Sequence, residues 1–103
     1  MARLANNFAA HIAAAAGDDL ALLAELRGAF AESFAQHLDL LGRARCDGNW
    51  RIAAQRLNVL GASFHMGDLV DLAQEALESA PGDPRIVRKL TALCERFSAD
   101  PPA

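Results

Sequence analysis

The chain contains no tyrosine among its 103 residues, and β-branched residues are sparse. Both scarcities argue against a β-sheet, because these residue types favour strands. Apolar residues make up 52% of the sequence, and most of them are alanine and leucine, which are strong helix formers. We therefore expect an all-α protein. Its length fits one domain whose single hydrophobic core needs no disulfide or metal.

Cysteine occurs only twice, as Cys46 and Cys94. Two cysteines do not form a disulfide framework, and neither lies at the spacing of a metal ligand. No pair of His, Cys or Asp residues has the spacing of a zinc site either. We expect two reduced thiols, buried or half-buried, in a cytoplasmic protein, and we expect no metal and no cofactor.

Concentrated charge and long apolar runs are also missing. The net charge is −3, and the ten basic residues are spread along the chain, which argues against nucleic-acid binding. No apolar run approaches the roughly 18 residues of a membrane span. The opening "MARLANNFAAHIAAAAG" has the alanine content of a signal peptide, but His11 and two asparagines interrupt it, so we expect a helix there. Nucleophile elbows, phosphate loops and dinucleotide glycine patterns are absent.

Apolar residues at helical spacing predict five helices, which Gly, Asn, Asp and Pro residues separate. The predicted limits are about 3–16, 18–45, 50–66, 67–80 and 84–98. Gly17 is expected to end the first helix, and Asp18 or Asp19 to cap the second. Asn49 is the expected N-cap of the third helix, which begins at Trp50. Asp83 and Pro84 are expected to begin the fifth helix.

Short connections between amphipathic helices imply antiparallel neighbours. The predicted fold is therefore an antiparallel up-down four-helix bundle with a short extra N-terminal helix. Residues 1–103 form a single domain in this prediction. Its core covers about 18–98, residues 1–17 form the N-terminal helix, and residues 99–103 form a frayed tail.

The segment "AAQRLNVLGASFHMGDL", from Ala53 to Leu69, carries the most information about function. Its frame is an alanine before Gln55, a leucine two residues after it, two small residues, an aromatic residue and a leucine that follows Gly67: Ala54, Leu57, Ala62, Ser63, Phe64 and Leu69. Upstream, "DGNW" forms a turn. This frame resembles the motif of the histidine-containing phosphotransfer (HPt) domain of bacterial two-component phosphorelays, which reads roughly A-H-x-L-K-G, small residues, an apolar residue, G-A and a leucine.

The resemblance extends from Gly17 to Phe97, about four-fifths of the chain. It implies a four-helix bundle, but the reactive positions differ. Gln55 stands at the position of the phospho-accepting histidine, Asn58 at that of the lysine and Val59 at that of the glycine. Phosphoryl transfer needs a nucleophile in line with phosphorus and nearby charge neutralisation, which a carboxamide and a neutral Asn do not supply. The resemblance therefore implies a degenerate member that is not an enzyme.

His65 and Met66 stand where the family often has Gly-Ala. On a helix with about 100° per residue, six residues of the segment lie within a narrow arc: Arg51, Gln55, Asn58, Val59, Ala62 and Met66. Apolar groups ringed by polar ones often mark a contact site, and we predict that this arc binds the partner. The alternative is that Val59, Ala62 and Met66 pack on a neighbouring helix.

Three histidines remain as candidate acceptors. His37 lies on the apolar stripe of the second predicted helix, and we expect it to be a partly buried core residue. His11 flanks the first stripe and is expected to be half exposed. His65 is a candidate for a displaced phospho-acceptor, but no lysine or small-residue frame surrounds it.

Three functions remain open at this point. In the first, the chain binds a response-regulator receiver domain or a histidine kinase and modulates phosphate flow without catalysis. In the second, Gln55 orients water for hydrolysis of a receiver's aspartyl phosphate, as glutamine does elsewhere in phosphoryl chemistry. In the third, the chain is an unrelated helical dimerisation module. We expect a monomer, with a homodimer as the alternative.

Overall fold

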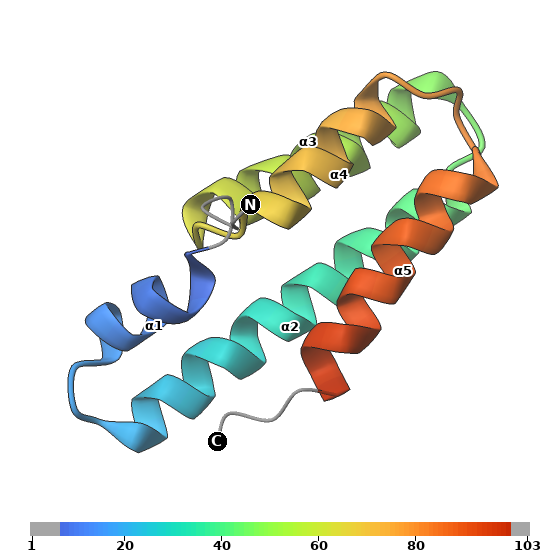
Figure 1. Ribbon diagram of the computed structural model, residues 1–103. Helices are drawn as coiled ribbons and strands as arrows, with labels where there is room; N and C mark the ends of the chain where they lie inside the picture. The colour runs from blue at the N-terminus through green and yellow to red at the C-terminus, as the bar shows by residue number, and fades with distance from the viewer. Residues whose placement is uncertain (1–6, 100–103) are drawn as a thin grey trace.

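The computed structural model describes residues 7–99, and all of its regular structure is helical (Figure 1). No strand occurs in this part of the chain. The five helices are α1 (Phe8–Ala16), α2 (Leu20–Arg43), α3 (Asp47–Ser63), α4 (Gly67–Leu77) and α5 (Pro84–Ala99). The expected all-α class is confirmed. The predicted start of the first helix near Arg3 and the predicted tail at 100–103 lie outside the described residues.

Helices adjacent in the sequence pack against each other, and α2 also packs against α5. Successive helices run in opposite directions (Figure 1). The molecule is elongated, with principal extents of 44 × 28 × 21 Å. The longest helix, α2, follows this long dimension, and α1 lies beside its first turns. We call α1 together with the first turns of α2, residues 8–27, the hairpin.

Three helix ends lie at the residues that the sequence predicted. Asp19 caps α2, because its carboxylate accepts hydrogen bonds from the backbone N–H groups of Ala21 and Leu22 at 3.0 and 3.1 Å. Gly17 ends α1 with φ of 64°, a value at which a side chain would be strained. Asp83 precedes α5, and its carboxylate accepts from the N–H of Arg85 at 2.9 Å. These three predictions are confirmed.

The start of α3 differs from the prediction. The helix begins at Asp47, after Cys46 in an extended conformation, so Asn49 is inside the first turn and is not the N-cap. The N–H of Trp50 already donates to the carbonyl of Cys46 at 3.0 Å. Asp47 lies in this first turn, where the helix dipole favours a negative charge. Gly48 and Asn49 indicated a break, but they are accommodated within the turn.

A cluster of phenylalanines forms the centre of the core. The ring of Phe30 from α2 lies 4.7 Å from Phe8, 5.0 Å from Phe64 and 5.1 Å from Phe97, measured between centroids. The cluster thus joins α1, α2, α5 and the end of α3. Aromatic pairs at such separations contribute about 0.5–1.5 kcal/mol beyond the area that they bury. The apolar stripes predicted from the sequence supply these residues.

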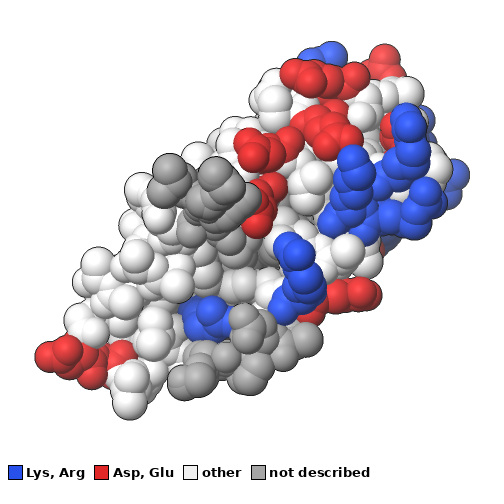
Figure 2. Space-filling view, in the orientation of Figure 1, with Lys and Arg blue, Asp and Glu red and all other residues white. Residues whose placement is uncertain are grey.

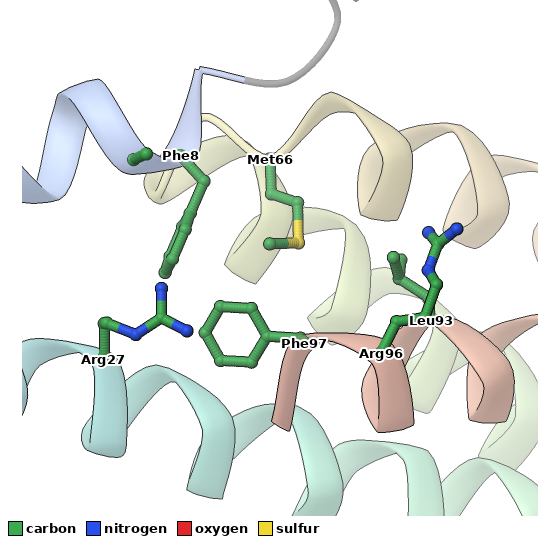
Figure 3. A pocket seen from close by; sticks show the side chains of 7 residues that line it. Phe8, Arg27, Met66, Leu93, Arg96 and Phe97 are labelled. Atoms are coloured by element: carbon green, nitrogen blue, oxygen red, sulfur yellow. The ribbon is translucent and has the colours of Figure 1, made fainter. Parts of the chain in front are cut away.

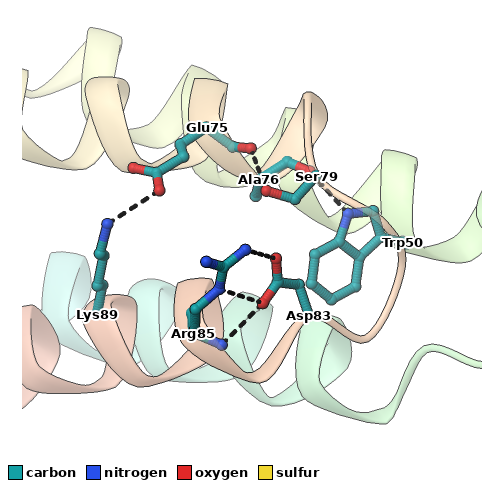
Figure 4. Close-up of polar contacts among 7 residues, drawn as sticks. All are labelled: Trp50, Glu75, Ala76, Ser79, Asp83, Arg85 and Lys89. Carbon is teal, nitrogen blue, oxygen red and sulfur yellow. Dashed lines mark hydrogen bonds and ion pairs between the residues drawn. The ribbon is translucent and has the colours of Figure 1, made fainter.

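At the other end of α3, Trp50 connects it to α4 (Figure 4). Its ring is buried, and its indole N–H donates to the carbonyl of Ala76 at 2.8 Å. An exposed ion pair, Lys89 to Glu75 at 3.0 Å, joins α5 to α4 nearby. The close-up also shows the Arg85–Asp83 pair at 3.4 Å, which lies at the beginning of α5.

Gly61 sets the distance between α3 and α4. A methyl group at this position would lie 3.0 Å from both Val70 Cγ2 and the Val70 backbone nitrogen, and 3.1 Å from Leu69 Cβ. Since these separations are too short for ordinary contacts, the two helices can approach this closely only because residue 61 has no side chain.

The structure also bears on the expectations about the two cysteines and about membrane-spanning helices. Cys46 is exposed, so the expectation of a buried or half-buried thiol is wrong there, although Cys94 is partly buried as expected. Both thiols are free. Burial, with a smaller contribution from Glu95, raises the pKa of the Cys94 thiol. Within residues 7–99, none of the helices combines the length and the apolar character that crossing a membrane would require.

Candidate functional site

The middle of α3 presents an exposed face around Gln55. Gln55 itself is exposed. Two large apolar side chains beside it are also accessible, with exposed fractions of 49% for Ile52 and 63% for Val59. These residues are three or four positions apart, so they lie on one side of the helix. Leu40 of α2 is a further exposed apolar residue, at 46%.

This face borders a shallow groove of about 620 Å³ between α2 and α3. Its lining residues are His37, Ile52, Gln55, Arg56, Val59, Leu60, Ser63 and Phe64. A second hollow of about 360 Å³ continues toward the start of α3 and includes Leu40, Ile52 and Arg56. Five residues that line these two hollows form what we call the α3 face: Leu40, Ile52, Gln55, Arg56 and Val59. It is mainly apolar and carries a cation at its centre.

His37 is the titratable group that the groove contains. It is half-buried, as predicted, and its Nδ1 is buried without a hydrogen-bond partner. Burial lowers the pKa of His37 below its ordinary value of 6.5, and the positive charge of Arg56 lowers it further. The imidazole is therefore held neutral near pH 7, and the fixed positive charge of the groove comes from Arg56.

The six residues of the predicted arc divide into three groups. Gln55 and Val59 line the groove. Arg51 and Ala62 are exposed on α3 but outside it. Asn58 is half-buried, and Met66 is buried. The structure therefore brings two of the six together at a concave surface.

The other two residues of the arc, Asn58 and Met66, pack against the rest of the fold. Asn58 is half-buried, and its side-chain amide donates to the carbonyl of Val70 in α4 at 3.4 Å. Met66 is 3% exposed and belongs to the core, so its placement on an accessible arc is wrong. The reason is that α3 ends at Ser63. The angle of 100° per residue therefore no longer applies at residue 66, and the packing alternative holds for this residue.

The chain reversal after α3 depends on His65. This residue has φ of 59°, in the left-handed region. The N–H of Met66 donates to the carbonyl of Gly61 at 2.8 Å, and that of His65 donates to Ala62 at 3.3 Å. These two bonds form a Schellman motif, whose left-handed residue is usually glycine. His65 is also contacted by α1, because its ring centroid lies 4.4 Å from that of His11.

Sequence reasoning missed Ile52, Arg56, Leu40 and the inclusion of His37 in the groove. The actual face is rotated by roughly 60° from the predicted arc, toward α2. Helical spacing does connect four residues that line the groove: Ile52, Arg56, Val59 and Ser63. However, Ile52 lies between the core residues Trp50 and Ala53 in the sequence, so its exposure is not evident from the pattern. The pattern does not show which neighbouring helix leaves part of α3 uncovered.

The chemistry available at the α3 face is that of binding. Gln55 has no nucleophilic nitrogen, since its lone pair is conjugated with the carbonyl. The apolar residues and Arg56 offer burial and one charge-assisted contact. A group of three or more potential metal-ligating side chains is not found among the residues that the structure describes.

Comparisons with protein-family models, with curated proteins and with solved structures find no match for this chain. The case for a function therefore depends on the chain's own residues.

Proposed function

We propose that the chain is a degenerate HPt-type module that binds a response-regulator receiver domain, or the histidine kinase of the same pathway, without catalysing phosphotransfer. One observation carries the proposal. Gln55, which stands at the position of the family's phospho-accepting histidine, is exposed in mid-helix beside two accessible apolar residues, Ile52 and Val59. The surface is thus available for docking, while the nucleophile is missing.

Two features of the fold support this proposal. The helices α2 to α5 contact one another in a closed series, α2–α3, α3–α4, α4–α5 and α5–α2, as the expected antiparallel up-down four-helix bundle requires. The left-handed conformation of His65 also falls where the family's motif often has glycine. A backbone that needs positive φ explains a glycine preference at that position.

Occupation of the α3 face by a receiver would regulate phosphate flow in a bacterial cytoplasm. The partner would cover Ile52 and Val59, and an acidic group on it would pair with Arg56. Mutations at the centre of such an interface have the largest effects. We therefore expect Val59→Glu to weaken binding at least tenfold, which corresponds to about 1.4 kcal/mol.

The direct test mixes the chain with receiver domains encoded in the same genome, each with and without phosphate. Complex formation and protein-bound phosphate are followed together. We expect a complex with no acid-labile phosphate on this chain, weakened by Val59→Glu. Leu20→Glu is the matched control, because Leu20 is an exposed leucine on a different surface. Phosphate on His37, His65 or His11 would show that the acceptor has moved and would contradict the proposal.

A second candidate, acceleration of aspartyl-phosphate hydrolysis, has one supporting observation: the exposed position of Gln55 on the groove. In this case the Gln55 amide would orient the attacking water. Gln55→Ala should then lengthen the lifetime of the receiver's phosphate while binding stays nearly unchanged. Equal loss of both, or loss of neither, would leave only the docking role.

A further inference from the structure

The hairpin carries an apolar face that shares no residue with the groove at Gln55. The whole of α1, "FAAHIAAAA", has no Asp, Glu, Lys or Arg residue. At the start of α2, Leu20 is 78% exposed, the most exposed of the large apolar side chains that the structure describes. Figure 2 shows this part of the molecule as a white surface with acidic residues at its tip.

A hollow of about 420 Å³ opens beside Leu20, between α1 and α2. Apolar side chains and one arginine line it: Ala9, Ile12, Ala13, Leu20, Leu23, Ala24 and Arg27. The four lining residues of α2 are spaced by three, one and three positions, which places them on one stripe of that helix. Leu20 is therefore an exposed side chain at the edge of an apolar hollow that is large enough to receive an apolar side chain.

Charge is distributed unequally along this face. Asp18 and Asp19 are exposed at the tip of the hairpin. Arg27 and Arg96 lie at its base, around a second pocket of about 470 Å³ (Figure 3). The guanidinium of Arg27 lies 4.6 Å from the centroid of the Phe97 ring, a contact that positions its charge there. Along the stripe of α2 that lines the hollow, the order is thus acidic, apolar, basic, and the exposed Glu25 lies on another side of this helix.

We propose that this face binds a second copy of the chain in an antiparallel, two-fold symmetric dimer. A two-fold axis across the apolar middle brings each acidic tip to the basic base of the other copy. The same rotation brings each Leu20 to the other copy's hollow, as a self-complementary interface requires. Because α1 has no acidic residue, two chains of net charge −3 can approach there without repulsion between carboxylates. The proposal is independent of the function proposed above.

The available surface suits a dimer of ordinary size. A stable interface buries about 800 Å² on each partner, which is about an eighth of the 6250 Å² that this chain exposes. The hairpin includes about a fifth of the residues. An anionic membrane fits less well, since the acidic tip would be repelled by it.

The test is sedimentation equilibrium of the full chain over a wide concentration range. We expect a dimer whose dissociation constant increases at least tenfold in Leu20→Glu, because a carboxylate would enter the apolar hollow. Asp18→Arg should also weaken the dimer and should reduce its sensitivity to salt. Both substituted side chains are exposed, and far-UV circular dichroism checks that each variant is folded.

Val59→Glu is the matched control and should leave the dimer unchanged. A monomer at all concentrations would overturn the proposal, and so would a dimer that Val59→Glu disrupts and Leu20→Glu does not. A monomer that floats with vesicles of zwitterionic and anionic lipid would assign the face to a membrane instead. Because receiver binding responds to Val59 and dimerisation to Leu20, failure of one proposal is distinguishable from failure of the other.

Discussion

At the scale of single residues, adding a side chain at Gly61 and at Gly28 should have opposite effects on stability. A methyl group on Gly61 would collide with Val70 and Leu69, whereas one on Gly28 would meet nothing within 4 Å. We expect Gly61→Ala to destabilise the fold by about 1–2 kcal/mol, since overpacking outweighs the gain in helix propensity. Gly28→Ala is the matched control and should stabilise it by about 0.5–1 kcal/mol. Urea unfolding measures both, and equal signs would refute this account of Gly61.

His37 gives the stability a dependence on pH. Since burial and Arg56 lower its pKa in the folded state below 6.5, the unfolded chain binds a proton more readily. Stability is therefore fully present above pH 6.5 and decreases as the pH falls through the lowered value. The melting temperature of His37→Gln should decrease less between about pH 7 and pH 5 than that of the original chain. Parallel curves for the two proteins would show that His37 does not contribute.

At the scale of helices, a buried hydrogen bond and an exposed ion pair hold α4 in place. The indole of Trp50 bonds the carbonyl of Ala76 inside the core, whereas Lys89 and Glu75 remain about half exposed. We expect Trp50→Phe to cost about 1–2 kcal/mol, from the lost bond and lost packing. Lys89→Ala should cost less than about 1 kcal/mol, because solvent screens the pair. Equal costs in denaturant unfolding would contradict this ranking.

Local signals explain how far the sequence predicted these helices. Asp19, Gly17 and the Asp83–Pro84 pair act through the backbone within a few residues, so their positions follow from the chain alone. Gln55 and Val59 were placed on an exposed side of α3 by periodicity. The same periodicity misplaced Met66, since it assumed that the helix continued past Ser63. The groove itself depends on how α2 and α3 are rotated against each other, which depends on packing between distant residues.

At the scale of the whole molecule, the α3 face and the hairpin face use different parts of α2, the first with α3 and the second with α1, and they differ in composition. The first surrounds a neutral histidine and Arg56. The second has no Asp, Glu, Lys or Arg along α1, and its stripe on α2 runs from Asp18 and Asp19 at one end to Arg27 at the other. If both proposals hold, a dimer would present two α3 faces, one to each of two receivers.

The order of contacts between the helices has a consequence for folding kinetics. Helices adjacent in the sequence are also adjacent in space, and the principal pairing between distant segments of the described chain is that of α2 with α5. Closing one long loop is then the main entropic barrier, which is typical of helical proteins that fold in microseconds to milliseconds. The α2–α5 contact can form only after the intervening turns have reversed the chain, so this step completes the fold.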